Sequence, residues 1–177
     1  MGELLMLDLC CGLKGASAAM RERGWIVLTV DIDPSFDPDV VADVRSWFWE
    51  GKRPDLVWAS PPCDEFSREF MPWSRTGKTP DLSVVEGCRR IIRECNPRYW
   101  IIENTRGAVP YLGKPAAVLN PYYLWGFFPP FPHGKRDFRH KELLSSTAKA
   151  ERAQIPYELS LMVATTIEVA IPLFEHA

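Results

Sequence analysis

The sequence predicts an α/β fold in which a mostly parallel sheet is flanked by helices. Short apolar runs of strand length alternate with segments whose apolar residues recur at helical spacing, which is the pattern of repeated strand and helix units. The chain has 177 residues, of which 46% are hydrophobic. This length supports one well-buried core and is too short for two ordinary domains. We therefore expect one domain that spans residues 1–177.

Five strands are expected from apolar runs that polar or turn-forming residues bound. They cover residues 4–9, 26–31, 40–44, 55–60 and 98–103. Helices are expected at residues 15–23 and 81–95. Gly24 is suited to end the first helix, and Thr79, Pro80 and Asp81 supply the cap and first turn of the second.

The second helix should bury one face, because Val84, Val85, Cys88, Ile91, Ile92 and Cys95 recur at helical spacing. Its arginines, Arg89, Arg90 and Arg93, should point outward. Dense prolines predict an irregular segment over residues 110–132 around a short strand at 122–126. A last helix at 157–170 is apolar on most sides, so we expect it to be buried.

Composition limits the class of protein. The net charge of −2 excludes a generally cationic nucleic-acid coat, although local basic patches remain possible. No apolar run approaches the roughly 18 residues of a membrane span, and the chain enters a strand without a signal peptide. We therefore expect a cytoplasmic protein without membrane association. The five cysteines and three histidines do not show zinc-ligand spacing, so we expect reduced thiols and no metal site.

One cysteine stands where a nucleophile is presented. The apolar run 55–60 is followed by Pro61 and Pro62, which cannot continue a central strand, so the chain must turn outward there. Cys63 then follows at the carboxyl end of a strand, where open α/β sheets place their ligands, and a polar loop comes next. The run 99–104 repeats this pattern and ends in Glu103 and Asn104. Two adjacent strand ends would bring a thiol and an acid together.

Three motifs in this order resemble the cytosine-C5 methyltransferase family. Pro62-Cys63-Asp64-Glu65-Phe66-Ser67 resembles the family's catalytic Pro-Cys-Gln-x-Phe-Ser, and Glu103-Asn104-Thr105 resembles Glu-Asn-Val. Residues 7–19 resemble the family's cofactor loop, Asp-Leu-Phe-x-Gly-x-Gly-Gly, with Cys10 in place of Phe and Lys14 in place of one Gly. The resemblance covers residues 4 to 106 and implies a Rossmann-like, S-adenosylmethionine-dependent methyltransferase fold.

The cofactor loop also has a physical interpretation. A strand that ends in glycines before a helix offers backbone N–H groups to a ligand, and a carboxylate after the next strand can hold ribose hydroxyls. Asp31 occupies that second position. The resemblance implies that Ile32 lies against the adenine, that Asp43 faces its amino group, and that Gly12 and Gly15 border the methionine part. The residues expected around S-adenosylmethionine are Asp8, Cys10, Gly12, Leu13, Gly15, Asp31, Ile32, Asp43, Val44 and Pro61.

The resemblance also implies the catalytic roles. Cytosine C5 is too weak a nucleophile to take a methyl group directly, so the Cys63 thiolate would first add to C6. Glu103 would contact N3 and the amino group of the base and donate a proton, and Asn104 belongs to the same motif. A thiol with an ordinary pKa near 8.5 needs help to ionise, which the helix that follows and Arg68 could supply. The alternative interpretation makes Cys63 an inert buried thiol.

Departures from the family leave the substrate open. Asp64 replaces the family's Gln and is followed by Glu65, and two carboxylates beside a nucleophile oppose thiolate formation unless they point away. The chain has no room for the family's target-recognition domain, and only residues 154–156 faintly resemble its Gly-Asn-x-Val-Pro motif. A partner protein or self-association would then supply recognition. The residues expected to hold nucleic acid are Ser67, Arg68, Arg75, Lys78, Arg136 and Arg139, with Phe70 and Trp73 able to stack or wedge.

Three functions follow from these patterns. The favoured one is methylation of cytosine C5 in DNA through a covalent Cys63 adduct. A second is a cofactor-binding or regulatory protein without turnover, which Asp64 and Glu65 favour. A third is a related RNA methyltransferase, because the same thiolate chemistry serves both polymers.

Overall fold

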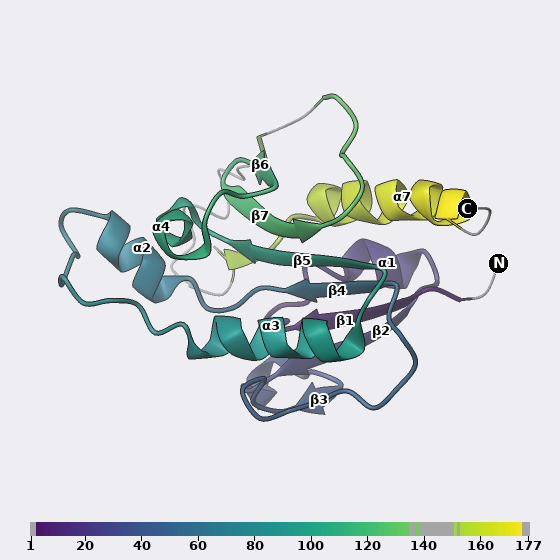
Figure 1. The fold of residues 1–177 in the computed structure, drawn as a ribbon, viewed down its shortest axis with the longest axis horizontal. Coiled ribbons are helices and arrows are strands. Elements are labelled where there is room, and N and C mark those ends of the chain that lie inside the picture. The colour runs from purple at the N-terminus through teal and green to yellow at the C-terminus, as the bar shows by residue number, and fades with distance from the viewer. Residues whose placement is uncertain (1–2, 135–136, 139–150, 152, 175–177) are drawn as a thin grey trace.

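The computed structural model describes residues 3–134, 137–138, 151 and 153–174 (Figure 1). Its strands form one seven-stranded sheet in the order β3-β2-β1-β4-β5-β7-β6. The pairs from β3 to β5 are parallel, whereas β7 runs antiparallel to both β5 and β6. The strands are β1 (Leu5–Leu9), β2 (Ile26–Asp31), β3 (Val40–Val41), β4 (Leu56–Ala59), β5 (Tyr99–Asn104), β6 (Ala117–Leu119) and β7 (Tyr122–Phe127).

Helices cover both faces of this sheet (Figure 1). The helix α1 (Ala18–Glu22) packs beside α7 (Tyr157–Phe174) on one face, and α3 (Ser83–Cys95) lies on the other. Two short helices, α2 (Asp64–Phe70) and α4 (Val109–Leu112), lie beyond the carboxyl ends of β4 and β5. Single turns of 3₁₀ helix occur at η1 (Pro34–Phe36) and η2 (Arg106–Ala108).

The strand order identifies the fold. The chain builds β1, β2 and β3 outward in one direction and then crosses back to place β4 on the other side of β1. Ligands of such sheets bind outside the carboxyl ends of the strands at this switch point. The predicted α/β class is confirmed: the chain has a Rossmann-like, mostly parallel sheet with helices on both faces.

Apolar residues fill a core on each face of the sheet. Trp58 and Tyr99 belong to the core beneath α1 and α7, where Ser160 of α7 accepts a hydrogen bond from the backbone of Ala19 at 3.1 Å. Ile91 of α3 belongs to the other core. Because α3 buries the apolar face that its spacing predicts, its two cysteines, Cys88 and Cys95, are buried core residues.

Several predicted boundaries were too wide, and local hydrogen bonding explains each difference. Helix α1 begins at Ala18 because the preceding loop adopts left-handed backbone angles, with φ of 59° at Lys14. Strand β3 ends at Val41, since the chain bends where the Asp43 carboxylate accepts the backbone N–H of Arg45 at 2.9 Å. Helix α3 begins at Ser83, whose N–H donates to the side chain of Asp81 at 2.8 Å.

Two other expectations were wrong. The residues after Cys63 form the helix α2 where a loop was expected, and β6 and α4 appear within the proline-rich segment 110–132 together with the predicted strand β7. The last helix is not buried on most sides, because it lies on the sheet surface and turns one face to solvent. Leu159 and Val163 of α7 are fully buried, whereas Val169 is 72% exposed. Among the described residues, no helix has the length and apolar character that a membrane span needs.

Candidate active site

A cavity of about 620 Å³ opens at the carboxyl ends of the central strands. This volume suits a nucleoside-sized ligand. The residues predicted around the cofactor that line it are Cys10, Gly12, Leu13, Gly15, Asp31, Ile32, Asp43 and Val44. Cys63 and Asp64 line the same cavity, so the folded chain brings the candidate nucleophile to the candidate cofactor loop.

Asp31 joins two walls of the cavity. Its Oδ2 atom accepts the N–H of Gly12 at 2.9 Å, and its Oδ1 atom accepts the N–H of Asp33 at 3.0 Å. The side chain is nearly buried, at 8% exposed. Each carboxylate oxygen still has a lone pair for a further donor, such as a ribose hydroxyl. Asp31 therefore fixes the shape of the loop and remains able to bind a ligand.

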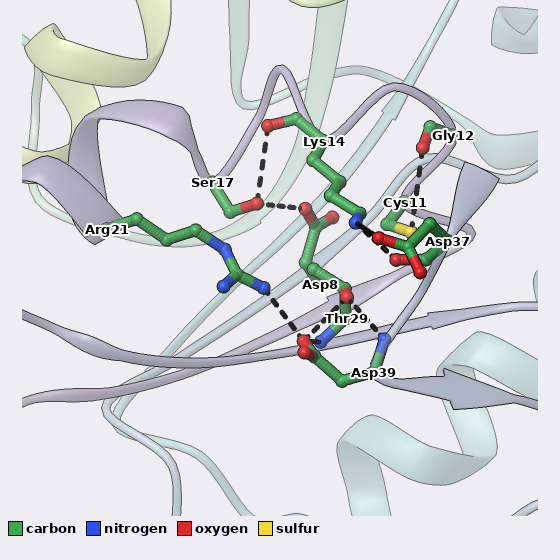
Figure 2. A network of polar contacts seen from close by, with 9 residues as sticks. All are labelled: Asp8, Cys11, Gly12, Lys14, Ser17, Arg21, Thr29, Asp37 and Asp39. Carbon is green, nitrogen blue, oxygen red and sulfur yellow. Dashed lines mark hydrogen bonds and ion pairs between the residues drawn. The ribbon is translucent and has the colours of Figure 1, made fainter.

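Asp8 was expected beside the cofactor, but it does not line the cavity. Its carboxylate lies under the loop and accepts a hydrogen bond from the hydroxyl of Ser17 at 2.6 Å (Figure 2). Its Oδ1 atom has no hydrogen-bond partner among the residues that the structure describes. Complete burial raises the pKa of Asp8 to about 7. Asp8 therefore holds the loop in place through its hydrogen bond with Ser17.

The loop is also joined to the chain that follows β2 (Figure 2). Lys14, which replaces a family glycine, donates its Nζ to the backbone oxygen of Asp37. Below this contact, the carboxylate of Asp39 accepts a hydrogen bond from the guanidinium of Arg21 at 2.8 Å. It also accepts the N–H and the hydroxyl of Thr29, at 2.8 and 2.7 Å. These bonds hold the 32–39 segment, which supplies one wall of the cavity, against α1, β2 and the loop after β1.

Asp43 carries a partner that the sequence interpretation missed. Arg45 lies over its carboxylate, with Nε at 3.0 and 2.9 Å from the two oxygens and a terminal nitrogen at 2.6 Å. These hydrogen bonds hold the pKa of Asp43 below its ordinary value. Both side chains line the cavity, so a ligand meets an ion pair here instead of a free carboxylate. Their spacing of two residues gave no signal of this pairing.

The C-terminal part of the chain completes the cavity. Gln154 and Ile155 line it, and a Cβ atom on Gly15 would lie 2.3 Å from the Ile155 backbone oxygen. The Gln154 backbone oxygen is held by the hydroxyl of Tyr122 at 3.1 Å. The faint resemblance of residues 154–156 to a family motif was the available signal for this wall.

Cys63 lies half-buried at the N-terminal end of α2, directly after the turn that Pro61 and Pro62 make. Pro62 lines the cavity, whereas Pro61, the predicted cofactor contact, is buried outside it. Burial raises the pKa of the Cys63 thiol, and the charges of Glu103 and Asp64 raise it further, against a hydrogen bond from Ser67 that lowers it.

The two carboxylates that follow Cys63 behave differently. Glu65 turns toward the start of α3, where its Oε2 atom accepts the N–H of Asp81 at 2.5 Å. Asp64 lines the cavity and raises the pKa of the thiol. Of the two departures from the family motif, only Asp64 therefore opposes ionisation of Cys63 in this structure.

Glu103 and Asn104 are the last two residues of β5, and their side chains have different surroundings. Burial raises the pKa of Glu103 to about 7, and the hydroxyl of Ser60, a residue of the cavity wall, bonds to its carboxylate. Asn104 is 1% exposed and uses both ends of its amide inside the protein: Nδ2 donates to the Pro61 oxygen at 2.9 Å, and Oδ1 accepts the Thr105 N–H at 2.9 Å. Asn104 therefore fixes the turn that carries Cys63.

Comparison with known proteins agrees with these motifs. The chain is 32% identical over 117 residues to the protein named "Probable DNA (cytosine-5)-methyltransferase" of Frog virus 3 (isolate Goorha). The matched residues make up 56% of this chain and 52% of the relative. The resemblance to cytosine-C5 DNA methyltransferases is confirmed. The chain spans about half the length of this curated relative, and no family model matches it.

Solved structures show weaker likeness. The methyltransferase EhMeth of Entamoeba histolytica gives a TM-score of 0.49 at 15% identity, over 80% of this chain and 58% of that one. The glycopeptide N-methyltransferase MtfA complexed with S-adenosyl-L-methionine gives 0.42 at 12% identity, over 71% and 64%.

Four of the six predicted nucleic-acid contacts lie on α2 or on the segment that follows it. Ser67 is on α2 with its hydroxyl 3.4 Å from that of Thr105. Arg68 is on the same helix and pairs with Glu69 at 3.1 Å. Arg75 and Lys78 are exposed on the segment that follows. Arg136 and Arg139 fall outside the described residues. Within the described part of the chain, no group of three His, Cys, Asp or Glu side chains is arranged to hold a metal ion.

Proposed function

We propose that this chain transfers a methyl group from S-adenosylmethionine to C5 of cytosine in DNA through a covalent bond to Cys63. The observation that carries the proposal is the shared cavity, which Asp31, the glycine loop and Cys63 all line. Glu103 ends the strand next to the one that leads to Cys63, and its charge acts on the thiol. The similarity to the Frog virus 3 relative supports the same reaction.

The residues of the cavity suit the cofactor. Asp31 would accept the ribose hydroxyls, Ile32 is 60% exposed and free to cover the adenine, and Gly12 has open space where a Cβ atom would stand. The Asp43–Arg45 pair would meet the adenine edge. When bound, S-adenosylmethionine supplies an electrophilic methyl group on a sulfonium, and all other steps belong to the chain and the base.

Cys63 would prepare the base for transfer. Its thiolate adds to C6 of cytosine, and the electrons of the C5–C6 double bond move toward N3, where Glu103 donates a proton. C5 then carries the electron density needed to form a bond to the methyl carbon. The methyl–sulfur bond breaks as this bond forms, and S-adenosylhomocysteine is left. Loss of the C5 proton to water and departure of the Cys63 thiolate from C6 then restore the ring, and Glu103 recovers its proton from N3.

The two ionisations are linked. Because burial holds the pKa of Glu103 near 7, a large share of this acid is already protonated at neutral pH. The charge of ionised Glu103 raises the pKa of Cys63, so a protonated Glu103 removes one of the three effects that oppose the thiolate. Binding of a base that keeps Glu103 protonated would therefore favour the nucleophile.

DNA is the proposed substrate, and the target base must leave the duplex to reach a half-buried thiol in the wall of a cavity. The side chains available to hold the backbone nearby are Arg68, Arg75 and Lys78 on α2 and the segment after it. Recognition of the surrounding sequence would come from a protein partner or a second copy of the chain.

A covalent trap tests this proposal. DNA that carries 5-fluorocytosine should become linked to the protein in the presence of S-adenosylmethionine, because fluorine cannot leave as a proton after transfer. The product should survive denaturing electrophoresis, and Cys63→Ser should abolish it. Cys95→Ser is the matched control, since Cys95 is buried in the core on α3. RNA of the same sequence, run in parallel, would reveal an RNA substrate. Methylated DNA without any adduct would contradict the mechanism.

One observation favours a second candidate function. Burial, Glu103 and Asp64 all raise the pKa of Cys63, and no cation is among the causes that lower it. A thiol held in its neutral form suits a cofactor-binding or regulatory protein without turnover. Binding of S-adenosylhomocysteine, together with neither methylation nor adduct on DNA or RNA, would support this second function.

A further inference from the structure

A solvent-exposed indole lies at the far end of the helix that begins beside the nucleophile. Trp73 follows α2 and is 81% exposed, more than any other large hydrophobic residue in the described part of the chain. Figure 1 shows α2 and the segment after it projecting beyond the carboxyl ends of the strands. Residues that follow these strand ends, Cys63 among them, line the cavity. Tryptophan is usually well buried, so exposure at this place needs a cause.

Hydrogen bonds to Glu69 hold the segment that carries Trp73 in place. The Glu69 carboxylate accepts the N–H of Thr76 at 3.0 Å, the N–H of Gly77 at 2.9 Å and the Thr76 hydroxyl. The Glu69 backbone oxygen accepts Nε of Arg75 at 2.9 Å. These hydrogen bonds lower the pKa of Glu69 to about 2, so the fastening persists at neutral pH. The turn is closed around Trp73 and holds it outward.

The helix beneath the turn is seated firmly. Phe66 is 2% exposed, and a Cβ atom on Gly107 would lie 2.3 Å from the Phe66 backbone oxygen, so α2 packs directly on η2. The Phe70 ring is covered by the guanidinium of Arg106 at 5.3 Å. Phe70 is still 48% exposed, but Trp73, at 81%, is the more open ring and has no such cation over it among the described residues. Nine residues separate Trp73 from Cys63, and the seven of them that form α2 span about 10 Å of helix.

We propose that Trp73 stacks on a base of the nucleic acid whose cytosine is presented to Cys63. The inference rests on the proposed function for its substrate and adds the residue that holds the neighbouring base. An indole offers a flat face to any base, and stacking gives affinity without sequence preference. The exposed cations Arg75 and Lys78 lie on the same turn and complement phosphates. This combination favours nucleic acid over an apolar protein surface.

Binding measurements in a Cys63→Ser background test the inference without turnover. Fluorescence anisotropy with labelled cytosine-containing oligonucleotides, single-stranded and duplex, gives each dissociation constant. Trp73→Ala should weaken binding about 5- to 150-fold, the range for loss of one stacked base. Trp73→Phe should retain most of the affinity. Phe48→Ala is the matched control, because Phe48 is an aromatic residue 57% exposed on the segment between β3 and β4, and it should bind normally.

Glu69→Gln tests the fastening separately. It keeps the indole and weakens the turn, so binding should weaken less than in Trp73→Ala. Thermal unfolding should show the same midpoint for the Trp73 variants as for their parent, since the side chain is exposed. Unchanged affinity in Trp73→Ala, equal losses in Trp73→Ala and Trp73→Phe, or a parent protein that binds no nucleic acid would each overturn the inference.

The two proposals fail in different ways. Weaker binding in Trp73→Ala by a protein that never methylates would keep the stacking site and reject the reaction. Methylation at the parent rate by Trp73→Ala, with unchanged oligonucleotide affinity, would reject the stacking site and keep the reaction.

Discussion

Replacing Gly15 by alanine tests whether the N-terminal loop and the C-terminal wall form one cavity. The new Cβ atom would lie 2.3 Å from the Ile155 backbone oxygen and 2.9 Å from Cγ of Gln154. Real Cβ atoms do not approach backbone oxygens this closely, so residues 154–155 must move away. Both of these residues line the cavity together with Gly15, and the change should therefore reach the ligand site.

The magnitude follows from overpacking. An added methyl group in a closely packed place costs roughly 1–3 kcal/mol, which lowers the unfolding midpoint by about 2–12 °C for a chain of this size. Gly12→Ala is the control from the same loop. No atom lies within 4 Å of its would-be Cβ, and its φ of 48° makes the cost one of backbone conformation, roughly 1–2 kcal/mol.

Calorimetry with S-adenosylhomocysteine and thermal unfolding separate the two variants. Gly15→Ala should raise the dissociation constant at least about fivefold, equal to roughly 1 kcal/mol, because the displaced wall no longer closes the cavity. A dissociation constant for Gly15→Ala equal to that of the wild type would refute the assignment of residues 154–155 to the ligand site.

Three further predictions concern the polar groups of the site. Asp31→Ala should weaken S-adenosylhomocysteine binding by about 1.5–3 kcal/mol, the range for hydrogen bonds to a charged group, and unchanged calorimetric affinity would remove Asp31 from the cofactor. If the reaction needs protonated Glu103 and ionised Cys63, the single-turnover rate should rise with pH to about 7 and then level off, because further thiolate is offset by loss of the protonated acid. Glu103→Gln should be slower by roughly 10²–10⁴-fold but should keep rising above pH 7; a plateau at pH 7 in this variant would assign the break to another group. Asp64→Asn should lower the pKa of Cys63 and speed its alkylation by iodoacetamide at pH 7.5, whereas Glu65→Gln should change it little, and equal effects would contradict the orientations seen here.

The sequence could predict the main strands and the point at which the site would form. Apolar runs bounded by turn residues marked β1, β2, β4 and β5, since a central parallel strand must be apolar on both faces. The Pro61-Pro62 pair ended one of these runs for a covalent reason that no tertiary contact can reverse. Cys63 and Asp31 were therefore placed at strand ends before any packing was known.

The predictions that differed were those in which a local pattern competed with a distant contact. Asp8 matched the cofactor motif, but Ser17 and complete burial make it a support beneath the loop. Asn104 matched the catalytic motif, but both ends of its amide form hydrogen bonds with the backbone of Pro61 and Thr105. A motif fixes which residue types are present, whereas the direction of each side chain depends on neighbours that the spacing does not name.

What the sequence by itself determined was the order of the main strands and of the helices α1, α3 and α7, together with the residue types at the strand ends, because these depend on periodicity, proline and residue type. The tertiary structure alone decided which of these groups share a cavity and how they are charged. Burial sets the pKa of Glu103 near 7, and a contact with the start of α3 turns Glu65 away while Asp64 lines the cavity. Such effects arise between residues far apart in the chain or from solvent exclusion, and a linear pattern carries no measure of either.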